Sequence, residues 1–169
     1  MTRFALVLLA ALSGAAAAKN DQCGSQPASC EISAPLYTFG RQQMTDVTPP
    51  IRAQGMTSIT CTKLVKPGFL VTVDVDLAGI PPRVPRELRS TAGSQLSYGL
   101  FLDAPLTLTW GDGSGGTYAI KDFIEMKGNE RVVTRNYMLY GQVDGGQQGD
   151  AGRYLDAVAV RLRYTTSCK

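Results

Sequence analysis

The 169-residue sequence contains no histidine, and its 4 cysteines form no Cys-x-x-Cys pair. Without histidine the chain cannot build a Ser-His-Asp or Cys-His catalytic arrangement, a zincin motif or any histidine-containing metal site. The net charge is only +3, and the 17 basic residues are spread among 14 acidic ones, so we do not expect nucleic acid as a partner. These absences exclude many enzyme classes. We expect a protein that is not an enzyme, with no catalytic residue, no metal ion and no small-molecule cofactor.

Long hydrophobic runs are also missing, except at the N-terminus. There a basic Arg3, an apolar run over residues 4–12 and small residues up to Ala18 form the pattern of a secretory signal peptide. The run is too short to cross a bilayer as a mature helix, and no second apolar stretch supports the alternative of a retained anchor. We therefore expect residues 1–18 to be removed on export. Residues 19–169 then form one domain, long enough for a hydrophobic core of its own.

Export affects how the four cysteines are interpreted. An even number of cysteines in an oxidising compartment favours disulfides over a metal site. Spacing alone leaves all three pairings open. Cys30 and Cys61 each lie in a strand-like run, whereas Cys23 and Cys168 lie near the two ends of the chain. We therefore favour one disulfide between Cys30 and Cys61 and a second between Cys23 and Cys168.

The mature chain shows alternation of apolar and polar residues with a period of two, and no convincing helical period. The clearest run is 69–77, where Phe69 and the valines face one way, and where Asp74 and Asp76 are expected on the wet face. Other predicted strands cover 32–39, 56–63, 96–102, 117–124, 131–143 and 154–164. Glycine and proline breakers separate these runs, and the connections are too short for crossover helices. The pattern predicts an all-β antiparallel sandwich or barrel.

A glycine-rich segment, Trp-Gly-Asp-Gly-Ser-Gly-Gly over residues 110–116, has two functional interpretations and a plainer one. A phosphate-binding loop would need a lysine followed by Ser or Thr and a helix, which are absent. A calcium site would need more acidic ligands than Asp112. Glycine supplies the positive φ angles that turns require, so we expect a tight hairpin turn here.

A further set of motifs extends over residues 30–164. It consists of a strand from Cys30 to Phe39-Gly40, Ser58-Ile-Thr-Cys61, Arg86-Glu-Leu88, Leu96-Ser-Tyr98-Gly-Leu100, Trp110-Gly-Asp-Gly113, Tyr140-Gly141 and Gly152-Arg-Tyr154-Leu-Asp156 with alternating apolar residues up to Tyr164. Together and in this order, these motifs resemble the spore coat protein U family, which includes the pilins of archaic chaperone-usher fimbriae. The resemblance implies an incomplete immunoglobulin-like antiparallel β-sandwich that lacks its last strand, with a disulfide at Cys30 and Cys61.

The same resemblance implies partners and a location. A missing strand leaves unpaired backbone groups and an apolar groove, which is costly in water until another strand fills it. In the family a periplasmic chaperone lends a strand first, and a neighbouring pilin subunit then replaces it at the usher by donor-strand addition. We therefore expect export through the periplasm to an extracellular fimbria or to the cell surface, with a part in adhesion or biofilm formation.

Two departures from a shaft pilin refine this expectation. Residues 19–29 contain no large aliphatic side chain. This segment therefore lacks the large apolar side chains at alternate positions that a donor strand needs. The chain also continues beyond Tyr164 to a tail that holds Cys168. We expect a tip or minor subunit that accepts a strand and donates none. The alternative is a free-standing secreted protein, or a structural protein of a spore or cell coat, whose groove is closed by its own chain.

Two loops rich in turn formers are candidate contact surfaces for a tip role. Their apolar residues are Leu64, Val65, Phe69, Ile80 and Val84. Exposed apolar loops can mark a binding site. The competing interpretation is that the loop residues fold back and cover the ends of the sandwich, and this is the more favoured one.

Overall fold

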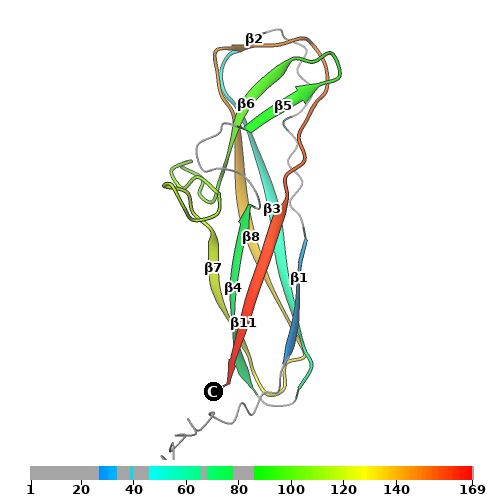
Figure 1. Cartoon of the computed structure of the whole chain (residues 1–169), viewed down its shortest axis with the longest axis vertical. Coiled ribbons are helices and arrows are strands. Elements are labelled where there is room, and N and C mark those ends of the chain that lie inside the picture. Colours follow the sequence, from blue (N-terminus) through cyan, green and yellow to red (C-terminus); the bar gives the residue numbers. More distant parts are fainter. Residues whose placement is uncertain (1–26, 34–38, 40–45, 66–67, 78–85, 169) are drawn as a thin grey trace, which may run out of the picture.

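The computed structural model describes residues 27–33, 39, 46–65, 68–77 and 86–168, without the side chains of Asp46 and Cys168. Every regular element in these residues is a β-strand (Figure 1). The strands are β1 (Ala28–Ser33), β2 (Asp46–Val47), β3 (Ile51–Lys63), β4 (Phe69–Leu77), β5 (Arg86–Ser90), β6 (Gln95–Phe101), β7 (Ile120–Met126), β8 (Val132–Val143), β9 (Gln147–Gln148), β10 (Tyr154–Leu155) and β11 (Val160–Cys168). None of the described segments is a helix of the length and apolarity needed to span a membrane.

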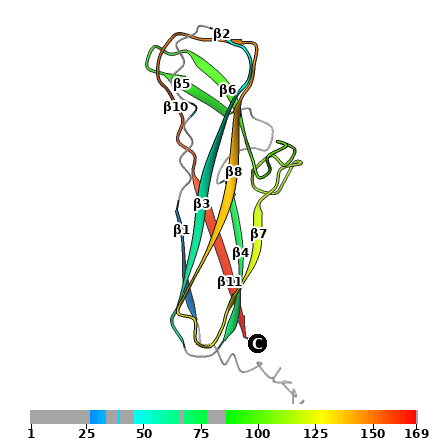
Figure 2. The same ribbon diagram turned by 180° about the vertical axis from the view of Figure 1, so that it is seen from behind.

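The strands form two main antiparallel sheets and one short pair. One sheet has the order β1-β3-β8-β6-β5-β10, the other has the order β11-β4-β7, and β2 pairs with β9. The two main sheets pack face to face along the long axis of the molecule. Figure 1 has the three-stranded sheet in front, and Figure 2 shows β3 and β8 from the opposite side. The predicted all-β, incomplete immunoglobulin-like antiparallel β-sandwich is confirmed.

The core lies between the two sheets and is centred on β4. Phe69, Val71, Val73, Val75 and Leu77 are completely or almost completely buried, as the alternation predicts. Burying each such side chain contributes roughly 1.5 to 3 kcal/mol to the free energy of unfolding, so this strand is a large part of the core. The strand also begins and ends at the predicted residues, between two segments rich in proline and glycine.

The opposite face of β4 differs from the prediction. Asp74 is partly exposed as expected, but Asp76 is completely buried. The antiparallel register places Asp76 opposite Arg161 and Asp74 opposite Arg163 in β11. Both arginine side chains make ion pairs with Asp76, so they cover a carboxylate that the alternation alone assigns to solvent. The expectation that Asp76 lies on a solvent-exposed face is therefore wrong.

The predicted strand over 154–164 is divided between the two sheets. β10 pairs with β5 in the six-stranded sheet, and β11 pairs with β4 in the other. Asp156 lies in the crossing between them, where it accepts a hydrogen bond of 2.5 Å from the Tyr98 hydroxyl and one of 2.8 Å from the Ala157 N–H. An Arg86 nitrogen also lies 3.8 Å from its carboxylate. These contacts fix the place where the chain leaves one sheet for the other.

Other strand boundaries also differ from the prediction. The first strand begins at Ala28 instead of residue 32, and residues 34–38 lie outside the described residues. β3 is longer than predicted because it begins at Ile51. β7 covers Ile120–Met126 where 117–124 was predicted.

The glycine-rich segment is a loop that connects the two sheets, and it is not the tight hairpin predicted. Trp110 forms a parallel bridge with Tyr118, whereas a hairpin would be antiparallel. The Trp110 N–H donates to Leu100 O at 2.8 Å in the six-stranded sheet, and Gly111 O accepts from Leu77 N–H at 3.2 Å in the three-stranded sheet. The backbone of this segment is therefore hydrogen-bonded to both sheets.

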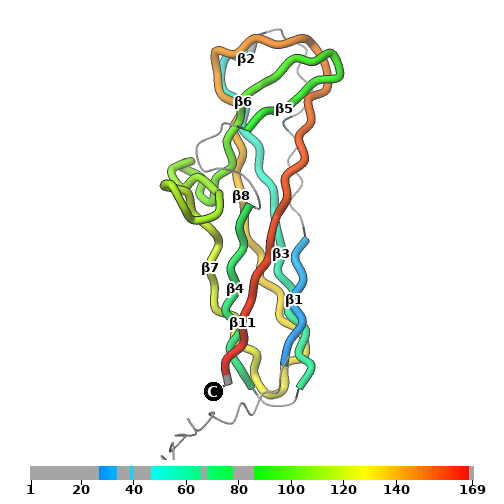
Figure 3. The backbone as a smooth tube through the Cα atoms, viewed as in Figure 1, coloured from blue at the N-terminus to red at the C-terminus, as the bar shows by residue number. Residues whose placement is uncertain are grey.

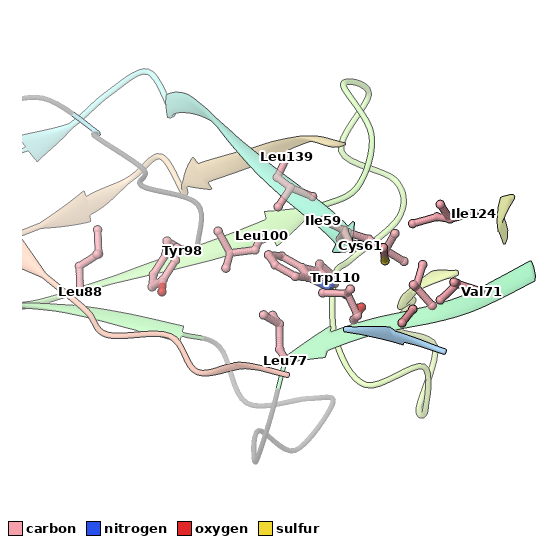
Figure 4. Close-up of a cluster of buried hydrophobic side chains, with 14 of the residues drawn as sticks. Ile59, Cys61, Val71, Leu77, Leu88, Tyr98, Leu100, Trp110, Ile124 and Leu139 are labelled. Carbon is pink, nitrogen blue, oxygen red and sulfur yellow. Dashed lines mark hydrogen bonds between the residues drawn. The ribbon is translucent and has the colours of Figure 1, made fainter. Parts of the chain in front are cut away.

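The side chains of this loop explain its composition. The buried Trp110 ring lies among Leu77, Leu100 and Leu139 in the core (Figure 4). A Cβ atom at Gly111 would lie under 3.0 Å from side-chain atoms of the buried Thr117. Glycine is needed at this position because no space remains for a side chain.

Candidate strand-acceptor edge

β11 is an edge strand whose core-facing side chains are incompletely covered. Val160, Leu162 and Tyr164 lie opposite Leu77, Val75 and Val73 in the antiparallel register, so they point to the same face as these core residues. The three partners in β4 are buried, with exposed fractions of 1% or less. In contrast, Val160 and Leu162 are only partly buried, and Tyr164 is 39% exposed. Within the part of the chain that the structure describes, no strand therefore covers the core on the β11 side.

β1 lies beside β11 but belongs to the other sheet (Figures 1 and 3). Its core-facing Cys30 and Ile32 lie opposite Cys61 and Ile59 of β3. Both partners in β3 are completely buried, while Cys30 and Ile32 are only partly buried. Among the described residues, no hydrogen bond joins β1 to β11. As far as the described strands show, the sandwich is not closed between β1 and β11.

We call this region the open edge and define it by Val160, Leu162 and Tyr164 of β11 together with Cys30 and Ile32 of β1. The outer side of β11 has no strand partner within the described residues. Natural edge strands are usually protected by charged side chains, prolines or bulges. The core-facing positions of the open edge carry no charge. An added strand with apolar residues at alternate positions could pair with the backbone of β11 and cover these side chains.

A disulfide fixes the β1 side of the open edge. Cys30 and Cys61 are register partners in β1 and β3, and their sulfur atoms are bonded over a sequence separation of 31. The structure therefore contains the first of the two predicted disulfides. Cys23 and the side chain of Cys168 lie outside the described residues. The second disulfide stays a prediction.

The predicted contact residues have different environments. Leu64 is 58% exposed directly after β3, whereas Val65 is partly buried and packs against the core. Phe69 is completely buried, so the expectation that it contributes to a contact surface is wrong for this residue. Ile80 and Val84 lie outside the described residues. Only Leu64, among the described residues of this set, is well exposed.

Asp112 in the glycine-rich loop has a local structural role. Its Oδ1 atom accepts hydrogen bonds from the Ser114 N–H at 2.9 Å and the Ser114 hydroxyl at 2.6 Å, with the Thr117 hydroxyl at 3.4 Å. These hydrogen bonds to Ser114 lower the pKa of Asp112 below its usual range, because they stabilise the carboxylate. The Asp112 carboxylate therefore stabilises the conformation of the loop to which it belongs.

Sequence reasoning from the residues did not identify the open edge as a unit. Alternation over 154–164 indicated which side chains are apolar, and it could not indicate what covers them. The signal lay in the resemblance, which implied a missing strand. The structure adds the pairing of β11 with β4 and of β1 with β3, and among the described residues no strand pairs with the outer side of either β11 or β1.

Comparison with known protein families agrees with this architecture. Residues 22–161 match the Spore Coat Protein U domain, which is a structural, pilin-like domain and not a catalytic one. No curated protein matches the chain. The matched region extends from before β1 to the beginning of β11, and it includes both cysteines of the disulfide. The chain belongs to the Spore Coat Protein U domain family.

Proposed function

We propose that this protein is a subunit of an archaic chaperone-usher fimbria and accepts a donor strand at the open edge. The observation that carries the proposal is the partial exposure of Val160, Leu162 and Tyr164 beside an edge of β11 that has no partner in the described chain. A strand inserted between β11 and β1 would cover these side chains and the partly buried Cys30 and Ile32. It would also complete the three-stranded sheet.

The energetics explain why the incoming strand must be apolar at alternate positions. Each backbone hydrogen bond to β11 contributes about 0.5 to 1.5 kcal/mol net. Ordering the incoming chain costs about 1 to 2 kcal/mol per residue, so backbone pairing alone does not hold a strand. Each apolar side chain that becomes fully buried at the open edge adds roughly 1.5 to 3 kcal/mol. A donor therefore binds through its apolar side chains, and the backbone sets its register.

Family membership supports a particular order of partners. A periplasmic chaperone would occupy the open edge first, and a neighbouring pilin subunit would replace it at the usher by donor-strand addition. The Cys30–Cys61 disulfide supports passage through an oxidising compartment, the periplasm, on the way to the fimbria or cell surface. On this proposal residues 1–18 are the signal peptide and 19–169 the mature domain.

The composition of residues 19–29 supports a place at the tip or at a minor position. This segment has no large aliphatic residue and so cannot fill the open edge of a neighbour. A subunit of this kind accepts a strand from its neighbour but donates none, so it stands at the end of the fimbria or at a minor position. An adhesive role is consistent with the tip of the fimbria. The alternative, a free-standing coat protein, requires a segment of the same chain on the open edge. No part of the described chain pairs with the outer side of β11.

The test uses the full exported chain and a synthetic peptide as long as β11, 9 residues, with alternating valine and threonine. We expect one peptide to bind per chain and to raise the melting temperature, because a ligand that binds only the folded state stabilises it by mass action. The control peptide has the same composition with its valines in one block. Binding of both peptides equally, or of neither, contradicts the proposal. A stable monomer indifferent to every alternating peptide favours the free-standing coat protein.

An extended chain provides a second measurement. A turn and the alternating strand are fused behind the C-terminus, from where they can fold back along β11 in antiparallel pairing. This extended chain should melt at a higher temperature than the natural chain and should no longer bind the free peptide. Unchanged melting together with continued peptide binding would mean that the peptide binds elsewhere.

A further inference from the structure

The three-stranded sheet has a second edge, β7, and this edge carries a charge where the open edge carries none. The register places Asp122 opposite the completely buried Val73, so its side chain points to the core face of the sheet. Its neighbours on that face, Ile120 and Ile124, are buried. Asp122 therefore interrupts an apolar row with a partly buried carboxylate.

Both oxygens of this carboxylate are hydrogen-bonded. The Tyr137 hydroxyl donates to Oδ2 at 2.6 Å, and the Phe123 N–H donates to Oδ1 at 2.7 Å. Tyr137 belongs to β8 of the six-stranded sheet, so its hydrogen bond joins the two layers on this side of the sandwich. Burial raises the pKa of Tyr137, and the hydrogen bond to Asp122 raises it further, which keeps the hydroxyl protonated as a donor.

The two edges would present different side chains to an incoming strand. A strand added at β7 would lie beside the Tyr137–Asp122 hydrogen bond, which joins β7 to β8, and would cover the Asp122 side chain. It would also leave the carboxylate facing an apolar interface, and an unpaired buried charge is strongly unfavourable. At the open edge the corresponding side chains are Val160, Leu162 and Tyr164, which gain cover. A charged residue that points inward is a known protection of edge strands.

We propose that Asp122, held by Tyr137, prevents strand addition at β7 and so directs an incoming strand to β11. This inference rests on the proposed function, because it assigns the residue that makes one edge an acceptor and the other not. A sandwich with two acceptor edges would bind two strands and would build branched or sheet-like aggregates. Asp122 is thus a specificity-determining residue for strand addition.

The test starts from the extended chain described above, in which the fused strand occupies β11. The extended chain should bind no alternating peptide and should remain a monomer in light scattering. Asp122→Val restores an unbroken apolar row on β7. We expect the extended Asp122→Val chain to bind one peptide per chain, or to pair with a second copy when the peptide is absent.

Two further variants keep the test interpretable. Lys121→Val changes a charged residue to valine on the same strand, but Lys121 is exposed on the outer face, and we expect no binding and no dimer. Asp122→Asn keeps the shape of the side chain and one acceptor oxygen while it removes the charge. It should fold and show a weaker gain of binding than Asp122→Val.

Folded Asp122→Val and Asp122→Asn chains that bind no peptide and remain monomers overturn the inference. Equal peptide binding by the Lys121→Val chain also overturns the inference, because any charged residue of β7 would then prevent strand addition as well as Asp122 does. Failure of the proposed function has a different signature, since the natural chain with a free β11 would then bind no alternating peptide. In that case the effect of Asp122→Val on β7 is still measurable by itself.

Discussion

Asp76 of β4 and Arg161 of β11 are register partners and form an ion pair with two parallel contacts. Arg161 Nε lies 3.0 Å from Asp76 Oδ1, and Arg161 Nη2 lies 2.9 Å from Oδ2. Arg163 adds a contact of 2.7 Å to Oδ2. The Asp76 side chain is completely buried, while the two arginines are 47% and 50% exposed. The edge strand β11 is therefore held to β4 by charge-assisted hydrogen bonds on the face away from the core.

We expect Asp76→Ala to lower the free energy of unfolding by about 2 to 3 kcal/mol, since hydrogen bonds to charged groups contribute at that level. Asp74→Ala is the matched control. Asp74 makes a single contact of 3.3 Å with Arg163 and is partly exposed, so its loss should be below about 1 kcal/mol. Urea unfolding of the two variants gives the comparison. Equal losses would mean that the buried ion pair adds nothing to the attachment of β11.

The two faces of β4 give a second prediction. Val73→Asp places a carboxylate in the completely buried core and should cost several kcal/mol, a large part of the roughly 5 to 15 kcal/mol that holds such a domain together. Asp74→Val changes the outer face and should stay within about 1 kcal/mol. Soluble yield from the periplasm and thermal melting measure the difference. Similar yields from the two variants would contradict the assignment of faces.

Gly111 provides a third prediction. Gly111→Ala introduces a Cβ under 3.0 Å from Thr117 side-chain atoms, and we expect a loss of about 1 to 3 kcal/mol from overpacking. Thr117→Gly removes the whole obstructing side chain, including the Cβ atom, which is one of the clashing atoms. The double variant should therefore lose less stability than the sum of the two single variants, because residues in contact are energetically coupled. Additive losses in this double-mutant cycle would place the strain of Gly111→Ala elsewhere.

The disulfide gives a fourth prediction. Replacing both Cys30 and Cys61 by alanine should cost about 2 to 5 kcal/mol, as is typical for a native disulfide in a small secreted domain. The double replacement avoids leaving a free thiol. Because β1 forms one side of the open edge, the alternating peptide should also bind more weakly. Unchanged melting and unchanged peptide affinity would show that β1 is held by its pairing with β3 alone.

Alkaline pH provides a fifth prediction through Tyr98. Burial raises the pKa of Tyr98 above its usual value of about 10, and the hydrogen bond to Asp156 adds to the increase. The folded state therefore favours the protonated hydroxyl more than the unfolded state does. This contribution to stability is complete below about pH 10 and is lost as the pH rises toward the folded pKa. Stability should fall above pH 10 by this mechanism.

Tyr98→Phe is the variant that checks this alkaline prediction. It should lower stability at neutral pH by about 1 kcal/mol, because the hydrogen bond to Asp156 is lost. Its stability should then depend less steeply on pH above 10. Tyr137 has a pKa raised in the same direction, so some dependence remains. A slope identical to that of the natural chain would contradict the role of Tyr98.

The sequence predicted those parts of the fold that depend on local pattern. The strand Phe69–Leu77 was predicted to the residue, because uninterrupted alternation is bounded by proline and glycine on both sides. The burial of Asp76 could not be predicted in this way. It depends on the register with Arg161, which is 85 residues away, and only the folded pairing brings the two together.

The candidate site shows the same limit. Apolar alternation in 154–164 was visible, but the division into β10 and β11 depends on where Asp156 meets Tyr98 and Arg86. Asp122 lies within the predicted strand over 117–124, but its role depends on Tyr137, which belongs to the other sheet. Which edge stays open depends on strand order, and strand order is a property of the whole chain.

The position of the disulfide has a mechanical consequence. Cys30 is the third residue of β1, and Cys61 belongs to β3, which is paired on both sides. A pull on the chain ahead of Ala28 reaches the sulfur–sulfur bond before the rest of β1 can peel away. The tension then passes through the disulfide to β3, which is hydrogen-bonded to both β1 and β8. Residues of β1 beyond Cys30 therefore cannot be pulled away from the sheet unless β3 also yields or the disulfide breaks.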